Sequence, residues 1–103
     1  MNDANRVVET ASKLCDLILP DGFEEQCRRE GSVVERSDLF EVKAQIGDSA
    51  ILLEIDSQFT RVKSLLIGKG GNNIRAICSI CTSVSRQEGF KLFDISVVKN
   101  GKR

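Results

Sequence analysis

One stretch of the sequence decides the fold, Leu66-Ile67-Gly68-Lys69-Gly70-Gly71-Asn72-Asn73-Ile74-Arg75-Ala76-Ile77. Apolar residues lie at both of its ends, and three glycines with a lysine lie between them. Glycine tolerates positive φ and lets a ligand approach the backbone, and it commonly ends a helix. We therefore expect two helices joined by a glycine loop, whose free N–H groups and positive helix end attract an anion such as phosphate.

An amphipathic helix is expected at the N-terminus, within residues 1–22. Apolar side chains recur there at the 3.6-residue period, and Pro20-Asp21-Gly22 ends the run. Asn2 or Asp3 is available as the helix cap. Because a single apolar stripe has to be buried against another element, this helix is expected to cover a sheet.

The segment between this helix and the loop is expected to form strands. Residues 23–36 are mostly polar, with Val33 and Val34 near the end, and we interpret them as an irregular edge strand. Residues 39–46 suggest one strand, and residues 51–55 suggest a second with apolar residues on both faces. Gly47-Asp48-Ser49 between them predicts a tight turn, so the two strands are expected to form a hairpin.

Two helices and a strand are expected to complete the chain. Ser57 is a candidate cap for a short helix that Gly68 ends. Beyond the loop, apolar residues return at helical spacing as far as Gly89. Residues 90–98 then alternate loosely and predict a closing strand, followed by a basic tail at 99–103.

The resulting order is helix, strand, strand, helix, helix, strand, which is typical of an α+β fold with helices packed on one face of a three-stranded mixed sheet. A chain of 103 residues is the size of one compact domain. We expect a single domain over 1–103, with its main body in 38–98. No run approaches the roughly 18–20 apolar residues that cross a bilayer, so no membrane partner is expected.

The net charge of zero hides a segregation of charge along the chain. Residues 1–56 carry 6 Lys and Arg against 13 Asp and Glu, whereas residues 57–103 carry 9 against 2, so the two parts have net charges of −7 and +7. One interpretation is that two solvated faces of opposite sign attract each other within the fold. We favour the other, that the basic part binds a polyanion.

The glycine stretch resembles the signature of KH domains, in which a Gly-x-x-Gly loop clamps the backbone of single-stranded RNA. A hairpin precedes it and one strand follows it, so the order resembles the prokaryotic, type II arrangement. Residues 52–98 are most similar to the C-terminal KH domains of Era-type GTPases, including Ser57-Gln58 ahead of the loop helix, and also resemble short stand-alone bacterial KH proteins. The resemblance implies non-catalytic binding of ribosomal RNA in small-subunit assembly, with ribosome assembly proteins as further partners.

The candidate RNA-binding residues are the loop and its basic or apolar neighbours. Lys69 supplies a mobile positive charge, and Arg75 reinforces it from the next helix. The alternative is that the glycines only form a sharp turn between helices. In the family pattern Ile67 and Ile74 flank an apolar groove for bases, with the strand around Leu53 and Ile55 as its far wall. The complete set is Ile67, Gly68, Lys69, Gly70, Gly71, Asn72, Asn73, Ile74, Arg75, Arg61 and Lys63.

Other chemistries fit the sequence less well. A nucleotide-binding P-loop requires Gly-x-x-x-x-Gly-Lys-Ser/Thr, which the glycine stretch lacks. Cys78-Ser79-Ile80-Cys81 places both thiols on the apolar helix face, and a zinc site would need Cys15 and Cys27 to converge without histidine, so core packing is favoured. There is no histidine for general base work. We therefore expect no catalytic residue, no metal, no cofactor and no enzymatic activity.

Four cysteines without disulfide spacing predict reduced thiols in an intracellular protein of the cytoplasm or mitochondrial matrix. A second function stays open besides RNA binding. The chain is then a protein-interaction module with a KH fold, which docks a partner through its acidic N-terminal half and acts as a scaffold in a ribonucleoprotein particle.

Overall fold

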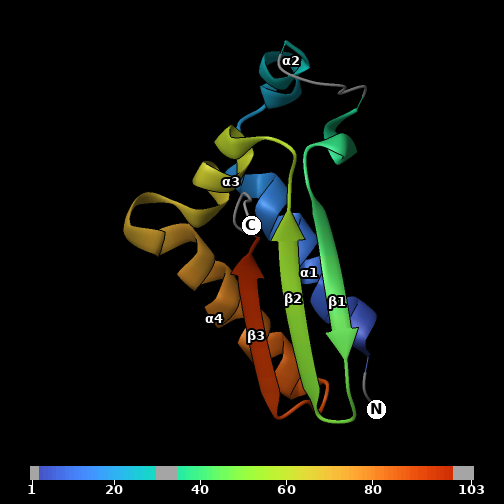
Figure 1. The fold of residues 1–103 in the computed structure, drawn as a ribbon. Coiled ribbons are helices and arrows are strands. Elements are labelled where there is room, and N and C mark those ends of the chain that lie inside the picture. The colour runs from blue at the N-terminus through green and yellow to red at the C-terminus, as the bar shows by residue number, and fades with distance from the viewer. Residues whose placement is uncertain (1–2, 30–34, 99–103) are drawn as a thin grey trace.

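The computed structural model describes residues 3–29 and 35–98, and within them the chain is an α+β fold (Figure 1). Val33, Val34 and the basic tail at 99–103 lie outside the described residues. The helices are α1 (Ala4–Ile18), α2 (Phe23–Arg28), α3 (Thr60–Ile67) and α4 (Asn72–Gln87), with 3-10 turns η1 (Arg36–Asp38) and η2 (Lys69–Gly71). The strands are β1 (Glu41–Ile46), β2 (Ala50–Asp56) and β3 (Leu92–Val97).

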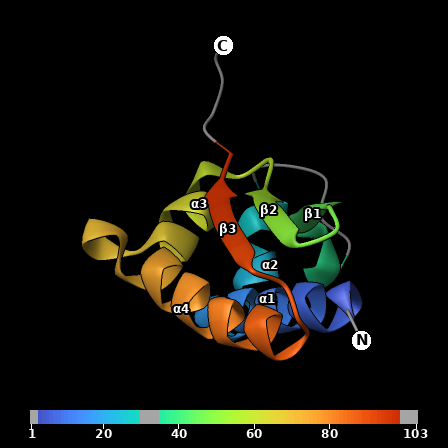
Figure 2. The ribbon, with the colours of Figure 1, turned by 90° about the horizontal axis from the view of Figure 1, so that it is seen from below.

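The three strands form one mixed sheet in the order β1-β2-β3. β2 is antiparallel to β1 and parallel to β3. The crossover from β2 to β3 passes through α3 and α4, and α1 and α4 lie on the same face of the sheet (Figure 2). The prediction of an α+β fold with a three-stranded mixed sheet is confirmed. None of the helices in 3–29 and 35–98 is both long and apolar enough to cross a bilayer.

The core lies between the sheet and the helices. Alternate residues of β2, namely Ile51, Leu53 and Ile55, are buried, whereas Leu52 and Glu54 between them are exposed on the open face. The predicted role of Leu53 and Ile55 as a groove wall is therefore wrong. Their side chains are only 1% and 0% exposed, so no ligand reaches them.

Helix α1 forms much as its periodicity predicts. The Asp3 carboxylate accepts the N–H of Arg6 at 3.3 Å and caps the helix. Val7, Ala11 and Cys15 recur every four residues and are fully buried, so one stripe of the helix faces the core.

The predicted edge strand in 23–36 is wrong over its first part, because Phe23–Arg28 is the helix α2. Phe23 and Cys27 are four residues apart and both are buried, which is helical spacing. Gly22 precedes the helix with φ +76°, a conformation natural to glycine. The helix is short and carries two apolar anchors, so its pattern is easily overlooked.

The remaining elements differ from prediction chiefly at their ends. Helix α3 begins at Thr60, so Ser57 is not its cap; the Ser57 hydroxyl instead donates to the Leu39 carbonyl and accepts the N–H of Phe59. Gly68 ends α3 as predicted. Strand β1 starts at Glu41, two residues later than predicted. Leu39 is buried but lies outside the sheet.

Candidate nucleic-acid interface

The glycine loop lies between α3 and α4, with η2 inside it (Figure 1). The N–H of Gly68 donates to the Ser64 carbonyl at 2.9 Å and closes α3. Gly68, Gly70 and Gly71 have φ values of +78°, +63° and +80°, which residues other than glycine rarely adopt. The backbone path therefore requires glycine at three of the four loop positions.

Asn73 fixes the loop from inside. Its Nδ2 donates to the Leu65 carbonyl at 2.7 Å and so joins the start of α4 to the last turn of α3. A Cβ on Gly68 would lie 2.8 Å from the backbone nitrogen of Asn73, which is too close for any side chain. The backbones of the two residues can approach each other because residue 68 is glycine. Asn73, predicted to contact RNA, is thus held as an anchor of the loop.

The backbone N–H groups of the loop divide into occupied and available donors. The N–H of Gly71 donates to the Gly68 carbonyl at 3.0 Å, and that of Asn72 donates to the Lys69 carbonyl. Within the described part of the chain, the N–H groups of Lys69 and Gly70 have no acceptor, and both residues are exposed. The available donors therefore lie in the 3-10 turn η2, and are fewer than those of the open first turn of α4 that the sequence suggests.

The loop itself carries positive charge, from Lys69 and Arg75. Residues 57–87 contain five Lys and Arg and no Asp or Glu. Lys69 is exposed at the tip. Arg75 donates to the Asn72 Oδ1 at 3.0 Å, and its Nη1 would be 3.4 Å from a Cβ on Gly71. Its guanidinium therefore lies over Gly71, the last residue of the loop.

Two predicted site residues lie elsewhere. The Lys63 side chain is only 9% exposed and its Nζ is 3.4 Å from the Asp56 Oδ1, so it is a core-facing partner of β2. Arg61 lies in the first turn of α3, at the end away from the loop, and donates to the Gln26 Oε1 of α2 at 3.3 Å. The predicted contact of Lys63 with RNA is therefore wrong, whereas Arg61 is exposed at a distance from the loop.

The apolar flanks of the loop are partly as predicted. Ile67 is 39% exposed and Ile74 is half-buried, so both remain beside the loop at the surface. The strand next to α4 is β3, whereas β2 lies in the middle of the sheet (Figures 1 and 2). Any groove wall opposite the loop therefore comes from β3.

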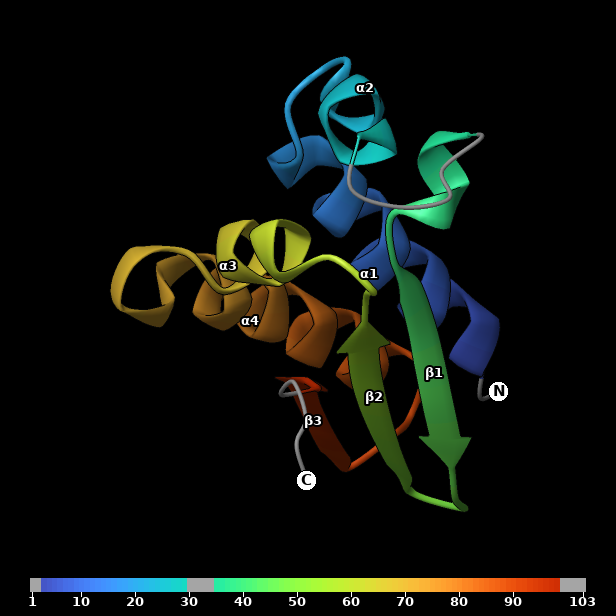
Figure 3. The ribbon, with the colours of Figure 1, turned by 45° about the horizontal axis from the view of Figure 1, so that its top comes forward.

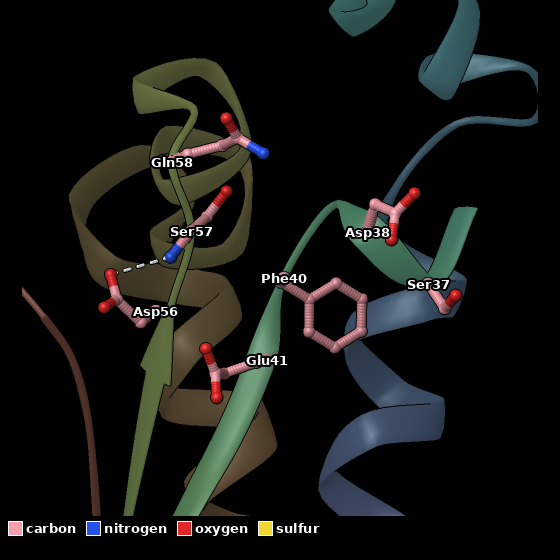
Figure 4. A pocket seen from close by; sticks show the side chains of 7 residues that line it. All are labelled: Ser37, Asp38, Phe40, Glu41, Asp56, Ser57 and Gln58. Atoms are coloured by element: carbon pink, nitrogen blue, oxygen red, sulfur yellow. Dashed lines mark hydrogen bonds between the residues drawn. The ribbon is translucent and has the colours of Figure 1, made fainter. Parts of the chain in front are cut away.

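Apart from the loop, the structure has a hollow that the sequence did not predict, where β1 begins and β2 ends (Figure 4). It measures about 470 Å³. Glu41 and Asp56 come from facing strands because the hairpin register pairs them, and η1 adds Asp38. Carboxylates from η1, β1 and β2 thus line one hollow at this end of the sheet. The lining residues are Ser37, Asp38, Phe40, Glu41, Asp56, Ser57 and Gln58.

The cysteines form part of the core. Burial raises the pKa of Cys15 to about 12, with a smaller contribution from Cys81. Burial likewise raises the pKa of Cys81 to about 11, with a smaller contribution from Cys78. Both therefore stay protonated at neutral pH and are weak nucleophiles and ligands. Over 3–29 and 35–98, no group of three or more His, Cys, Asp or Glu side chains is arranged to hold a metal ion.

Comparisons with known proteins leave the site to be interpreted from its own residues. No protein-family model and no curated protein matches the sequence, and no solved structure matches the fold. What distinguishes the loop is physical: two available N–H groups, two cations beside them, and glycines that keep side chains away.

Proposed function

We propose that the chain is a type II KH domain that binds single-stranded RNA without catalysis, through Gly68-Lys69-Gly70-Gly71. The observation that carries the proposal is the pair of exposed, available N–H groups at Lys69 and Gly70, in a segment without any carboxylate. Hydrogen bonds from such groups to a charged oxygen are stronger than those between neutral partners.

The loop suits a phosphodiester better than it suits a bulky planar group. The two N–H groups donate to one phosphate, and the flexible Lys69 side chain places its ammonium group against the same phosphate. The Arg75 guanidinium, oriented by Asn72, reaches a neighbouring phosphate. Bases then lie along Ile67 and Ile74, where aliphatic contact replaces aromatic stacking, so modest affinity is expected.

The target proposed within this function is ribosomal RNA of the small subunit, with a role in subunit assembly inside the cell. Its support is the resemblance of residues 52–98 to Era-type KH domains. Crosslinking in cells, followed by sequencing of the attached RNA, tests the target directly. Enrichment of small-subunit RNA is the expected result, and a pool without ribosomal RNA contradicts it.

The binding function is tested with the double variant Lys69→Asp, Gly70→Asp. It places two negative charges where phosphate would lie, so affinity for short single-stranded RNA should fall about tenfold or more. Fluorescence anisotropy measures the affinity, and circular dichroism checks the fold. The matched control is Lys13→Asp, an exposed lysine on α1, which should bind like the natural sequence. Unchanged affinity in the loop variant contradicts the proposal.

A second candidate function is a protein-interaction scaffold within a ribonucleoprotein particle. The exposed Glu41 beside the hollow favours it, because its carboxylate suits a basic segment of a partner. Under this function, the loop variant keeps its partners, and Glu41→Lys loses them. Affinity purification of both variants from cell extract separates the two functions.

A further inference from the structure

Strand β1 is an edge of the sheet, with β2 on one side and, among residues 3–29 and 35–98, no strand on the other (Figures 1 and 3). All its residues except Val42 are exposed. An uncovered edge presents unpaired N–H and C=O groups to another chain.

Backbone hydrogen bonds on both sides of β2 determine which backbone groups of β1 face outward. The N–H of Gly47 donates to the Ala50 carbonyl at 2.8 Å, so this opposed pair is hydrogen-bonded and the pairs alternate from there. On the far side of β2, the Val98 N–H donates to the Ile55 carbonyl at 2.9 Å, as the same alternation requires. The residues with outward backbone groups are Val42, Ala44 and Ile46.

This edge lacks the usual protection against pairing. The one lysine of β1 is Lys43, and its Nζ lies 3.9 Å from the Asp56 Oδ2, across the hairpin and away from the free edge. Ile46 is 55% exposed although its side chain belongs to the helix-covered face. The strand contains neither proline nor a bulge, the other common devices of edge strands.

We propose that β1 pairs antiparallel with β1 of a second copy of this chain, about a two-fold axis at Ala44, to form a six-stranded sheet. In this register Ala44 lies opposite the partner's Ala44, and Val42 lies opposite the partner's Ile46. Each opposed pair exchanges two hydrogen bonds, so all three outward residues are satisfied. The interface is isologous, as two-fold dimers require.

The choice of a second copy rests on self-complementarity. With the axis at Ala44, Lys43 lies opposite the partner's Gln45, and the exposed Ile46 gains an apolar neighbour on the same face. Moving the axis to Lys43 would place two lysines directly opposite each other, which is destabilising. The net charge of zero adds no overall repulsion between copies. An interface of one strand edge is small, so the dimer is expected to be weak.

A cysteine placed at the axis tests the register. Opposed Cα atoms of a hydrogen-bonded pair lie about 5.5 Å apart, within the range that a disulfide spans. Ala44→Cys should therefore form a covalent dimer under mild oxidation. The matched control is Lys43→Cys, whose partner cysteine lies on the diagonal at about 7–8 Å and should crosslink much less. Equal crosslinking of both variants, or of the natural sequence, would overturn the register.

The dimer itself is tested by analytical ultracentrifugation up to millimolar concentration. The natural chain should reach twice its monomer mass, and Ala44→Pro should not, because proline removes an outward N–H while the β1–β2 bonds remain. Ile46→Lys should also stay monomeric. Leu92→Lys, at a 67% exposed position in β3 on the opposite side of the sheet from β1, should dimerise normally. A natural chain that stays monomeric, or an Ala44→Pro dimer, overturns the proposal. The loop variant should dimerise whether or not it binds RNA.

Discussion

The loop glycines are required for different reasons. A Cβ on Gly68 would lie 2.8 Å from the Asn73 nitrogen, a backbone atom that cannot move unless α4 shifts. A Cβ on Gly70 would meet nothing within 4 Å, so only its φ of +63° opposes a side chain. Two residues that look equivalent in the motif are therefore under different constraints.

Gly68→Ala should consequently destabilise the fold more than Gly70→Ala. We expect a loss of about 3 kcal/mol in the free energy of unfolding for Gly68→Ala, from strain and overpacking together. The loss for Gly70→Ala should be about 1 kcal/mol, from the positive φ alone. Urea denaturation measures both. Equal losses would contradict the contact between Gly68 and Asn73.

Asn73 and Lys69 should affect RNA binding in different ways. Asn73→Ala removes the bond to the Leu65 carbonyl and loosens the loop, so affinity should fall while its dependence on salt stays the same. Lys69→Ala removes a phosphate partner, so the slope of log K against log salt should decrease by about 0.7. Anisotropy titrations at several salt concentrations separate the two effects. A reduced slope in Asn73→Ala would mean that Asn73 contacts phosphate after all.

At the scale of elements, α1 and α4 share a core that contains Cys15 and Cys81. Burial raises the pKa of Cys15 from its ordinary 9 to about 12, so the folded state holds this proton more tightly than the unfolded state. The resulting stabilisation is complete below pH 9 and is lost as pH rises from 9 towards 12. Alkaline conditions should therefore loosen the packing of α1 on α4.

The comparison of the natural sequence with Cys15→Ala isolates this effect. The variant is less stable at neutral pH because it loses buried volume, but it has no thiol to ionise at this position. The difference in unfolding free energy between the two proteins should therefore narrow as pH rises above 9. Urea denaturation across that pH range measures the difference. A constant difference would show that Cys15 titrates normally in the folded state.

The elements best predicted from sequence are those in which the spacing of apolar residues repeats over several turns. The stripe of α1 and the apolar face of α4 each extend over several turns, and both helices form where expected. Helix α2 was missed because two anchors, Phe23 and Cys27, do not establish a period. A lysine on a short helix is expected to face solvent, so the sequence places Lys63 at the surface, whereas in the structure it is buried beside Asp56.

Contacts between distant segments could not be predicted at all. Arg36 donates to the Asp16 Oδ1 at 2.6 Å, to the Glu24 Oε1 at 3.1 Å, and to carbonyls at the end of α1. The Asp16 hydrogen bond, with smaller contributions from Glu24, holds the pKa of Arg36 above its ordinary value. Nothing in the local sequence distinguishes this arginine from the others. Its importance follows only from the folded arrangement of α1, α2 and η1.

Over the residues that the structure describes, 3–29 and 35–98, several of the basic side chains of the second half are held away from the loop. Lys63 is neutralised by Asp56, Arg61 is directed to α2, and Arg6 pairs with Glu88 at 2.7 Å between α1 and the end of α4. Lys69 and Arg75 remain at the loop. The expected contact with RNA is therefore local, with few phosphates.

The salt dependence of RNA binding measures how local that contact is. Two cations, Lys69 and Arg75, neutralise about two phosphates, so for a single strand the slope of log K against log salt should be about −1.4. Binding through all nine basic residues of 57–103 would give a slope several times steeper. Titration of a short single-stranded RNA over a range of potassium chloride concentrations gives the slope. A steep slope that persists in the Lys69→Asp, Gly70→Asp variant would move the binding surface from the loop to the rest of the basic half.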